Sequence, residues 1–251
     1  MSRIVVVGGT GLIGSKTVAQ LTAAGEDVVV ASPSTGVDAL TGEGLADALN
    51  GADVVVDTTR PPGASSDTEV LSFFTTLTRR LLDEATRAVV GHYVALTIVG
   101  TGGDQRVPYY TAKAAEEDLV RAAGLPYTLV HTTQFFEFFS TIGDISTTDA
   151  KVRLPGVRVR PLAAVDAATA VADAARGEPA GDIEAGGPDV MRLDEFVRQG
   201  LAADHDPREV VRDDNAPYFH GSVGVDTLVP SDEARLFETR FADWLSARQD
   251  A

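Results

Sequence analysis

Short apolar runs alternate with longer amphipathic segments through the first part of the chain. Several runs have continuously apolar, β-branched centres, such as V-V-V at 28–30 and at 54–56, which is typical of parallel strands buried on both faces. The runs predict strands at Arg3–Val7, Asp27–Ala31, Asp53–Asp57, His92–Val99 and Tyr127–Thr132. The segments between them predict helices at Ile13–Ala24, Gly44–Leu49, Asp67–Arg87 and Tyr109–Ala123. We therefore expect an α/β fold with a doubly wound parallel sheet, a Rossmann fold.

The segment V-D-A-L at 37–40 has two interpretations. It follows the second predicted strand after only P-S-T-G, whereas a crossover between parallel strands takes about a dozen residues or more. Either it is a third strand, reached without the usual helix, or it is a loop.

The pattern changes near Lys151. The run V-R-L-P-G-V-R-V-R-P-L is followed by a predicted helix at Val165–Arg176 and a predicted strand, I-E-A-G-G, at 183–187. Further helices are predicted at Leu193–Ala203 and Leu236–Arg248. Because no long linker separates this part from the rest, we expect residues 1–150 to form the core. Residues 151–251 would form a small α+β lobe packed on it within one integrated domain.

A glycine-rich stretch joins the first strand to the first helix, in the sequence I-V-V-V-G-G-T-G-L-I-G-S-K at 4–16. It fits G-x-G-x-x-G counted from Gly9. Glycine at these positions allows a tight turn, close approach of a pyrophosphate to backbone N–H groups, and close packing of helix on strand. A P-loop is the alternative, but its G-K-[S/T] ending is missing. The residues predicted to bind a dinucleotide here are Gly8, Thr10, Gly11, Leu12, Ile13 and Gly14.

The end of the second strand bears on which dinucleotide is bound. An NAD site usually has Asp or Glu there to hold the ribose hydroxyls, and this chain has Ala31 followed by Ser32. No carboxylate would repel a 2′-phosphate, and Ser32, Ser34 and Thr35 offer hydroxyls to receive it, although the loop has no arginine. The sequence favours NADP over NAD. Asp38 would restore an NAD site if the loop folds back.

The stretch V-P-Y-Y-T-A-K at 107–113 places Tyr109 one helical turn before Lys113. A free tyrosine has a pKa near 10, and an ammonium about 4 Å away contributes roughly 4 kcal/mol toward the phenolate at an effective dielectric near 20. Only 3 of the 21 basic residues are lysine, so a lysine at this spacing indicates a need for a compact ammonium. The alternatives are simple packing on a helix face, and Tyr110 as the tyrosine of the pair.

These motifs together resemble the short-chain dehydrogenase/reductase superfamily, in particular its atypical NmrA-like branch. The resemblance rests on V-V-V-G-G-T-G-L-I-G at 5–14, G-A-D-V-V-V-D at 51–57, A-L-T-I-V-G-T at 95–101, Y-Y-T-A-K at 109–113 and Y-T-L-V-H-T-T-Q-F-F at 127–136. It extends over essentially the whole chain, and only loosely over the C-terminal third.

The resemblance implies a catalytic trio. Tyr109 would exchange a proton with a substrate carbonyl, Lys113 would hold the nicotinamide ribose, and Thr97 would orient the carbonyl. Thr58 would lie near the adenosine or the pyrophosphate. Tyr110, Gln134, Phe135 and Phe136 are the predicted substrate residues, although core packing is the alternative for each phenylalanine.

Composition narrows the possible functions. A formal charge of −16 disfavours nucleic acid and anionic membranes as partners, and the absence of cysteine excludes disulfides and thiolate chemistry. The four histidines have no metal-ligand spacing, so no metal is expected. No signal-peptide pattern and no apolar segment of about 18 residues is present, which predicts a cytoplasmic protein.

We expect an NAD(P)H-dependent oxidoreductase that reduces the carbonyl, enone or quinone of a small organic molecule. Two alternatives use the same fold: a redox-sensing protein that binds the dinucleotide without turnover, and an epimerase or dehydratase without net redox change. The sequence identifies neither the substrate nor the oligomeric state.

Overall fold

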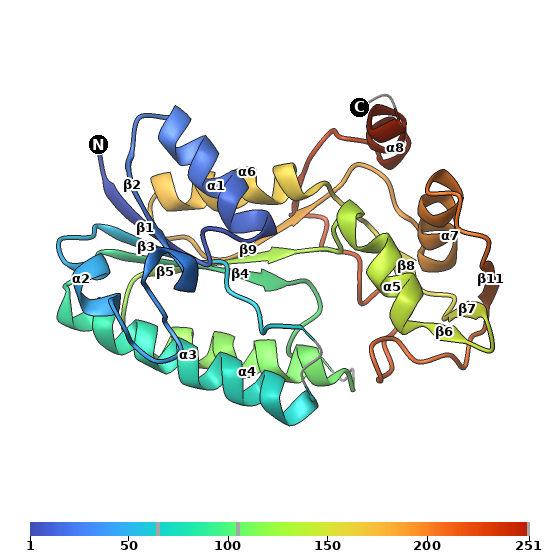
Figure 1. Ribbon diagram of the computed structural model, residues 1–251, viewed down its shortest axis with the longest axis horizontal. Helices are drawn as coiled ribbons and strands as arrows, with labels where there is room; N and C mark the ends of the chain where they lie inside the picture. Colours follow the sequence, from blue (N-terminus) through green and yellow to red (C-terminus); the bar gives the residue numbers. More distant parts are fainter. Residues whose placement is uncertain (64–65, 104–105, 250–251) are drawn as a thin grey trace. The chain divides into compact units, whose positions relative to one another are not determined.

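The computed structural model describes residues 1–63, 66–103 and 106–249 (Figure 1). Its larger sheet has seven strands, in the spatial order β12 (Arg235–Leu236), β9 (Gly181–Gly186), β5 (Tyr127–Thr132), β4 (His92–Ile98), β3 (Val54–Asp57), β1 (Arg3–Val7) and β2 (Asp27–Ala31). The pairs β1–β2, β1–β3, β3–β4 and β9–β12 are all parallel. The predicted α/β fold with a doubly wound parallel sheet is confirmed.

Residues 37–40 form a loop, so the third-strand interpretation is wrong. β2 lies at the edge of the sheet, and Asp38 makes only an isolated antiparallel bridge with Glu43. The Asp38 carboxylate accepts hydrogen bonds from the backbone N–H groups of Leu40 (2.8 Å) and Thr41 (3.2 Å). The chain therefore reverses within a few residues, because an aspartate side chain closes the turn on itself.

The chain forms two compact units built from interleaved segments. Unit 1 comprises Met1–Thr97, Ala112–His131 and Ala167–Ile183, and unit 2 comprises Ile98–Thr111, Thr132–Asp166 and Glu184–Ala251. The helices from the first part of the chain are α1 (Leu12–Ala23), α2 (Leu45–Leu49), α3 (Asp67–Arg87) and α4 (Pro108–Ala122), and α6 (Ala164–Arg176) follows later. The division into a core at residues 1–150 and a lobe at residues 151–251 of one integrated domain stays a prediction.

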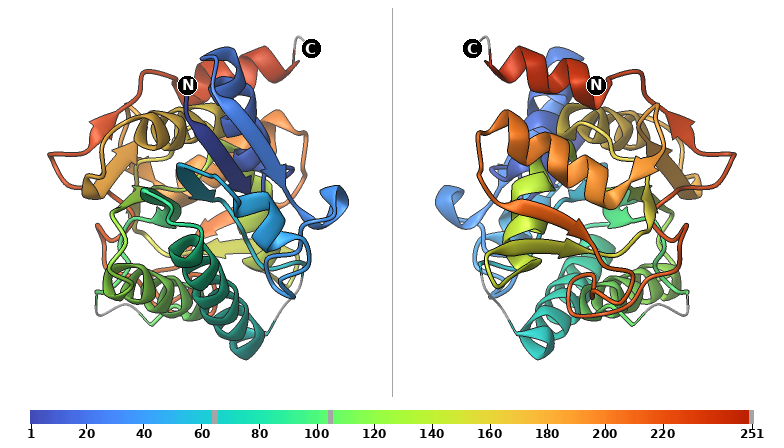
Figure 2. Two further views of the ribbon diagram at one scale, coloured as in Figure 1. Left: turned by 90° about the vertical axis from the view of Figure 1, so that its left-hand side faces the viewer. Right: turned by 90° about the vertical axis from the view of Figure 1, so that its right-hand side faces the viewer.

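In unit 1, helices cover both faces of the strands. Helices α3 and α4 run along one face, and α1 and α6 run along the other (Figures 1 and 2). Helix α3 begins at a capping box in which the Glu69 carboxylate accepts from the Ser66 N–H (2.7 Å). Its buried residues recur at helical spacing, so one stripe faces the sheet; they are Phe74, Leu77, Thr78, Leu81, Leu82 and Ala85.

Unit 2 combines short strands with helices. The helices include α5 (Phe139–Ile145), α7 (Leu193–Ala203) and α8 (Phe241–Gln249). A three-stranded sheet contains β6 (Thr147–Thr148), β7 (Lys151–Leu154) and β11 (Glu209–Arg212), and a separate pair contains β8 (Arg158–Val159) and β10 (Met191–Arg192). The core of this unit contains a group of aromatic rings, Phe136, Phe139, Phe196, Phe241 and Trp244.

The last helix begins later than its apolar pattern suggests. Leu236 was the predicted start, but Arg235 and Leu236 pair in parallel with Ala185 and Gly186 of β9, and the helix begins at Phe241. The predicted start was wrong because strand pairing at the sheet edge fixes this backbone before the helix can begin.

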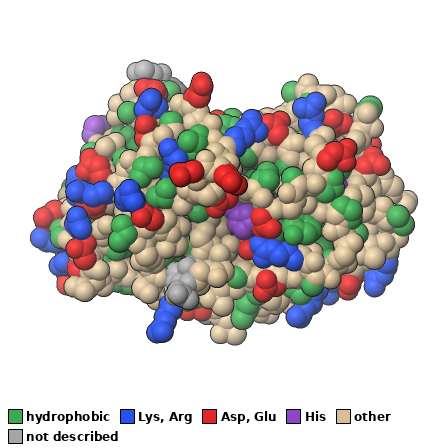
Figure 3. Space-filling view, turned by 180° about the vertical axis from the view of Figure 1, so that it is seen from behind, with side chains coloured by type: hydrophobic (Ala, Val, Ile, Leu, Met, Phe, Trp, Pro, Cys, Tyr) green, Lys and Arg blue, Asp and Glu red, His purple; other side chains and the backbone are tan. Residues whose placement is uncertain are grey.

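Acidic and basic side chains are interspersed over the face shown in Figure 3. The surface of the protein carries ion pairs such as that of Arg3 with Asp27 (3.0 Å) and that of Arg240 with Asp189 (2.6 Å). Pairs this exposed contribute little to stability, so the fold depends chiefly on its apolar cores. Over the ranges that the structure describes, no helix has both the length and the apolarity to cross a bilayer.

Candidate functional site

The first glycines form a tight turn between β1 and α1. Gly8 has a φ of 76°, in the left-handed region where glycine is favoured. Its N–H donates to the Ala31 carbonyl at the end of β2 (2.9 Å), and the Gly11 N–H donates to the Gly8 carbonyl (2.9 Å). The turn is therefore fixed to the carboxyl ends of β1 and β2.

Gly14 allows the first helix to pack directly on this turn. A Cβ atom at Gly14 would lie 2.2 Å from the Gly8 carbonyl oxygen and 2.7 Å from Oγ1 of Thr58, far inside van der Waals contact. The Thr58 hydroxyl donates to the Val7 carbonyl (2.9 Å), which fixes it beneath the turn. The predicted site residues Gly8, Gly14 and Thr58 are thus brought together.

The start of α1 fits the pyrophosphate of a dinucleotide. Gly11 precedes the helix without a capping side chain, and no acidic residue lies in the first turn. The first backbone N–H groups, which include those of Leu12, Ile13 and Gly14, therefore have no acceptor within the helix and favour an anion. Thr10 and Gly11 are exposed beside them, whereas the Ile13 side chain is buried.

The predicted hydroxyl residues after β2 form a compact cluster. A short 3₁₀ turn spans Pro33–Thr35, with the Ser32 and Ser34 hydroxyls 2.9 Å apart. The Thr35 hydroxyl donates to the Val30 carbonyl (2.9 Å) and accepts from the Ser32 N–H (3.0 Å). Asp38 does not join them in the hydrogen bonds described, since its carboxylate caps its own turn. The segment that follows β2 therefore presents uncharged hydroxyl groups.

Lys113 is buried in unit 1 with a defined set of partners. Its Nζ donates to the Leu96 carbonyl (2.8 Å), forms an ion pair with Glu116 and lies 4.6 Å from the centre of the Phe74 ring. Lys113 and Glu116 are only 3% and 2% exposed, so this ion pair is screened little by solvent. Burial raises the pKa of Glu116 to about 7, and the Lys113 ammonium opposes that rise.

A second carboxylate, Asp57, lies within the electrostatic reach of Glu116. It is 1% exposed and accepts from the Thr59 N–H (2.9 Å), the Thr59 hydroxyl (2.7 Å) and the Tyr93 hydroxyl (3.1 Å). Burial, followed by the charges of Asp57 and Glu116, holds the pKa of Tyr93 well above its usual range. Two carboxylates and one ammonium therefore share this interior.

Thr97 donates its hydroxyl proton to the Glu117 carboxylate (2.5 Å). Glu117 also pairs with Arg121 (3.3 Å), which in turn pairs with Asp182 (2.6 Å). His131 contacts the same two carboxylates, with Nε2 3.0 Å from Asp182. This network ties α4 to β4, β5 and β9, and it gives no support to a role for Thr97 in orienting a substrate carbonyl.

The two adjacent tyrosines of α4 lie in different surroundings within unit 2. Tyr109 is partly exposed, at the border of the apolar core. Tyr110 is 3% exposed, and burial raises its pKa well above the usual range. The Gln134 amide donates to the hydroxyls of Tyr110 (3.2 Å) and Tyr218 (3.1 Å). Tyr110 therefore resists ionisation, and of the two tyrosines Tyr109 is the one with an exposed surface.

The two predicted substrate phenylalanines are both buried. Phe136 is 1% exposed, and its ring centre lies 5.0 Å from that of Phe241 and 5.6 Å from that of Trp244. Phe135 is 8% exposed and its ring contacts Phe138 at 5.4 Å. The alternative of core packing therefore fits Phe136.

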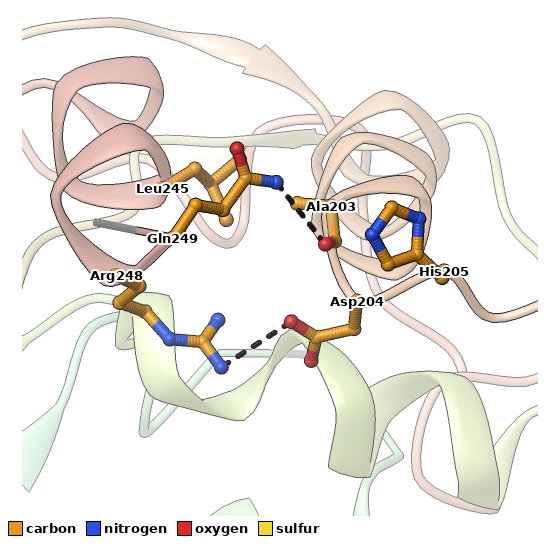
Figure 4. A pocket seen from close by; sticks show the side chains of 6 residues that line it. All are labelled: Ala203, Asp204, His205, Leu245, Arg248 and Gln249. Carbon is orange, nitrogen blue, oxygen red and sulfur yellow. Dashed lines mark hydrogen bonds and ion pairs between the residues drawn. The ribbon is translucent and has the colours of Figure 1, made fainter. Parts of the chain in front are cut away.

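A cavity of about 500 Å³ lies in unit 2 between the ends of α7 and α8 (Figure 4). Arg248 pairs with Asp204 across it (3.3 Å), and the Gln249 amide donates to the Ala203 carbonyl (3.2 Å). None of the predicted site residues lines this cavity. Nor do the described residues contain a group of three or more His, Asp or Glu side chains placed to hold a metal ion.

Sequence reasoning did not identify the partners of the predicted residues. Glu116 and Glu117 lie in the run A-A-E-E, which has the composition of a solvated helix face, and Tyr218 lies in a tract without a motif. Glu116 follows Lys113 at a spacing of three residues, and this helical spacing could have indicated that the two side chains pair.

One known family matches a large part of the chain. A family model described as NAD(P)H-binding matches residues 8–174, which is more than half of the 251 residues. A search of curated protein sequences finds no match to the chain.

Solved structures with a similar fold include nucleotide-sugar enzymes. WbmH from Bordetella bronchiseptica, solved in complex with NAD+, has a TM-score of 0.71 and 17% identity over 98% of this chain and 97% of that chain. UDP-N-acetylglucosamine 4-epimerase from Bacillus cereus gives 0.64 and 19%, covering 95% and 90%. TunA, an NAD-dependent NDP-hexosamine 5,6-dehydratase involved in tunicamycin biosynthesis, gives 0.69 and 16%, covering 100% and 99%. At these identities the likeness shows the fold alone.

Proposed function

Since the chain belongs to the NAD(P)H-binding family, we propose that it is an NAD(P)H-dependent oxidoreductase of the short-chain dehydrogenase/reductase type, in the NmrA-like branch. Its substrate would be the carbonyl, enone or quinone of a small organic molecule. The observation that carries the proposal is the Tyr-x-x-x-Lys pair in α4, in a chain whose glycine turn leaves the start of α1 open to a pyrophosphate. NAD(P)H, when bound, supplies a hydride.

In this proposal Tyr109 donates a proton to the substrate oxygen as negative charge develops there. Lys113 holds the nicotinamide ribose, and its ammonium favours the phenolate of Tyr109. Pro108 occupies the first position of α4, so Tyr109 lies in the first turn, where the helix dipole favours a negative charge. Thr97 is assigned a supporting role, because its hydroxyl donates to Glu117.

The parent protein tests the proposal directly. We expect the absorbance of NADPH to fall when ketones, enones and quinones are added as a panel of substrates. One molecule of reduced product should form for each molecule of NADPH consumed. Dinucleotide binding without turnover on any member of the panel would instead support a redox sensor.

A second candidate function is suggested by the structures of similar fold, which include an epimerase and a dehydratase. In that case nucleotide sugars would be converted with no reductant added and with no net change in NAD(P)H. Product analysis in the absence of added reductant separates this function from the reductase.

We also propose NADP as the preferred cofactor, supported by the neutral hydroxyls of Ser32, Ser34 and Thr35. Replacing exposed Ser34 by Asp should then weaken NADP+ binding by roughly 10- to 100-fold and leave NAD+ binding little changed, because a carboxylate repels the 2′-phosphate. Fluorescence titration with both dinucleotides measures this. Ser34→Asn is the uncharged control of matched size, and equal losses in both variants would contradict the assignment.

A further inference from the structure

The interior beside Lys113 holds more negative than positive charge. Lys113 forms an ion pair with Glu116, and Asp57 lies close enough for its charge to act on the same carboxylate. Both carboxylates are at most 2% exposed. Two ionised carboxylates beside one ammonium would leave an uncompensated charge in a medium that solvates it poorly, so the arrangement favours a proton on one of them.

The hydrogen bonds indicate which carboxylate takes that proton. Asp57 accepts from the Thr59 N–H, the Thr59 hydroxyl and the Tyr93 hydroxyl, and three donors suit an ionised group. Glu116 pairs with Lys113, and burial raises its pKa to about 7. The proton therefore belongs on Glu116.

We propose that Glu116 is a positioning residue for Lys113: it anchors the ammonium between Leu96 and Phe74, and its own charge sets how much positive charge Lys113 presents to a bound dinucleotide. This inference rests on the proposed function, because it takes Lys113 as the residue beside the nicotinamide ribose. When Glu116 is neutral, Lys113 and Asp57 balance each other and the group carries no net charge. When Glu116 is ionised, the group carries a net negative charge, and the attraction between Lys113 and the anionic dinucleotide weakens.

The groups that act on Glu116 come from three elements. Helix α4 contributes Lys113, which lowers the pKa of Glu116, and Glu117, which raises it, and β3 contributes Asp57, which raises it. The Tyr93 phenol of β4 stays neutral, since burial and the neighbouring carboxylates hold its pKa well above the usual range. With increasing pH, Glu116 is therefore the member of this group that becomes charged near neutrality.

The test compares two ligands with the parent protein. Between about pH 6 and about pH 8, the affinity for NADP+ should fall by roughly threefold to tenfold relative to that for adenosine 2′-monophosphate. The fragment lacks the nicotinamide ribose and the pyrophosphate but keeps the 2′-phosphate, whose ionisation near pH 6 is common to both ligands and therefore cancels in the ratio. A constant ratio of the two affinities across this range would overturn the inference.

Two matched variants locate the effect. Glu116→Gln removes the ionisable group with little change in shape, so the affinity ratio should no longer depend on pH. Glu117→Gln is the control on the neighbouring buried glutamate, which is bonded to Thr97 and Arg121. It should keep the pH dependence, with its midpoint moved to lower pH because one negative neighbour is lost. A Glu116→Gln profile identical to that of the parent would overturn the inference.

These measurements do not depend on turnover. A protein that shows the predicted pH dependence of binding but reduces no substrate contradicts the oxidoreductase proposal and leaves the role of Glu116 standing. A protein that turns over, with affinity ratios independent of pH, contradicts only the role of Glu116. If Glu116→Gln does not fold, the two-ligand comparison on the parent protein decides alone.

Discussion

Replacing Tyr109 by Phe should lower kcat by about 100- to 10,000-fold, the range expected when a general acid is removed. The ring is kept and only the hydroxyl is lost, so the packing of this partly exposed side chain at the border of the unit 2 core should not change. NADP+ affinity should stay within about twofold of the parent, because a small surface change of this kind has little effect on the rest of the fold. Steady-state kinetics and fluorescence titration measure the two quantities separately.

Tyr110→Phe is the matched control on the adjacent residue of the same helix. Its hydroxyl accepts from Gln134, and burial raises its pKa, so this change should cost about 1 kcal/mol of stability as one buried hydrogen bond is lost. Its effect on kcat should be far smaller than that of Tyr109→Phe. If instead Tyr110→Phe loses activity and Tyr109→Phe retains it, the assignment of the two tyrosines is reversed.

The parallel strands could be predicted from the apolar composition of their sequences alone. A strand covered on both faces has an uninterrupted apolar sequence, as the buried valines of β1 and β3 show; the valines of the edge strand β2 are partly buried. Helix α3 has the predicted bounds, Asp67–Arg87; in the structure Ser66 and Glu69 form a local capping box at its start, and its buried residues follow the helical period. These are signals within one element and need no knowledge of its neighbours.

The errors lie where specific hydrogen bonds override the apolar pattern. Leu236 continues the apolar pattern of the last helix, yet its backbone pairs with Gly186, fifty residues earlier in the chain. V-D-A-L has strand-forming composition, but the Asp38 side chain closes a turn before any pairing at the β2 edge. Neither outcome follows from the apolar pattern, because one depends on a side-chain hydrogen bond within the turn and the other on strand pairing with a distant segment.

The same distinction holds within the candidate site. The glycine turn could be predicted from the sequence because its backbone conformation requires glycine, as the positive φ of Gly8 illustrates. The partners of Lys113 and Thr97, which are Glu116 and Glu117, could not be predicted from the sequence, because consecutive glutamates on a helix usually face solvent. Glu116 and Glu117 are each 2% exposed, and only the tertiary fold buries them.

Gly14→Ala is expected to be the most damaging single substitution in the glycine turn. The added methyl would lie 2.2 Å from the Gly8 carbonyl oxygen, a backbone atom that cannot move without displacing the turn. We expect a loss of roughly 1 to 3 kcal/mol in the free energy of unfolding, as in other overpacked sites. Dinucleotide affinity should fall by about tenfold or more, because the first-turn N–H groups move with the helix. Chemical denaturation and fluorescence titration give the two values.

Gly11→Ala distinguishes the glycine needed for ligand binding from the glycine needed for packing of the helix on the turn. Gly11 has an ordinary extended backbone (φ −76°), and a Cβ there would lie 3.2 Å from the Gly8 carbonyl oxygen, so stability should change by only about 0.5 kcal/mol. The methyl would instead project from an exposed position at the start of α1, where the pyrophosphate must approach the backbone closely. Gly11→Ala should therefore lose affinity while staying folded, whereas Gly14→Ala should lose both. If the Gly14→Ala protein matches the parent in stability and affinity, the helix does not need this close approach, and the pyrophosphate must be held elsewhere.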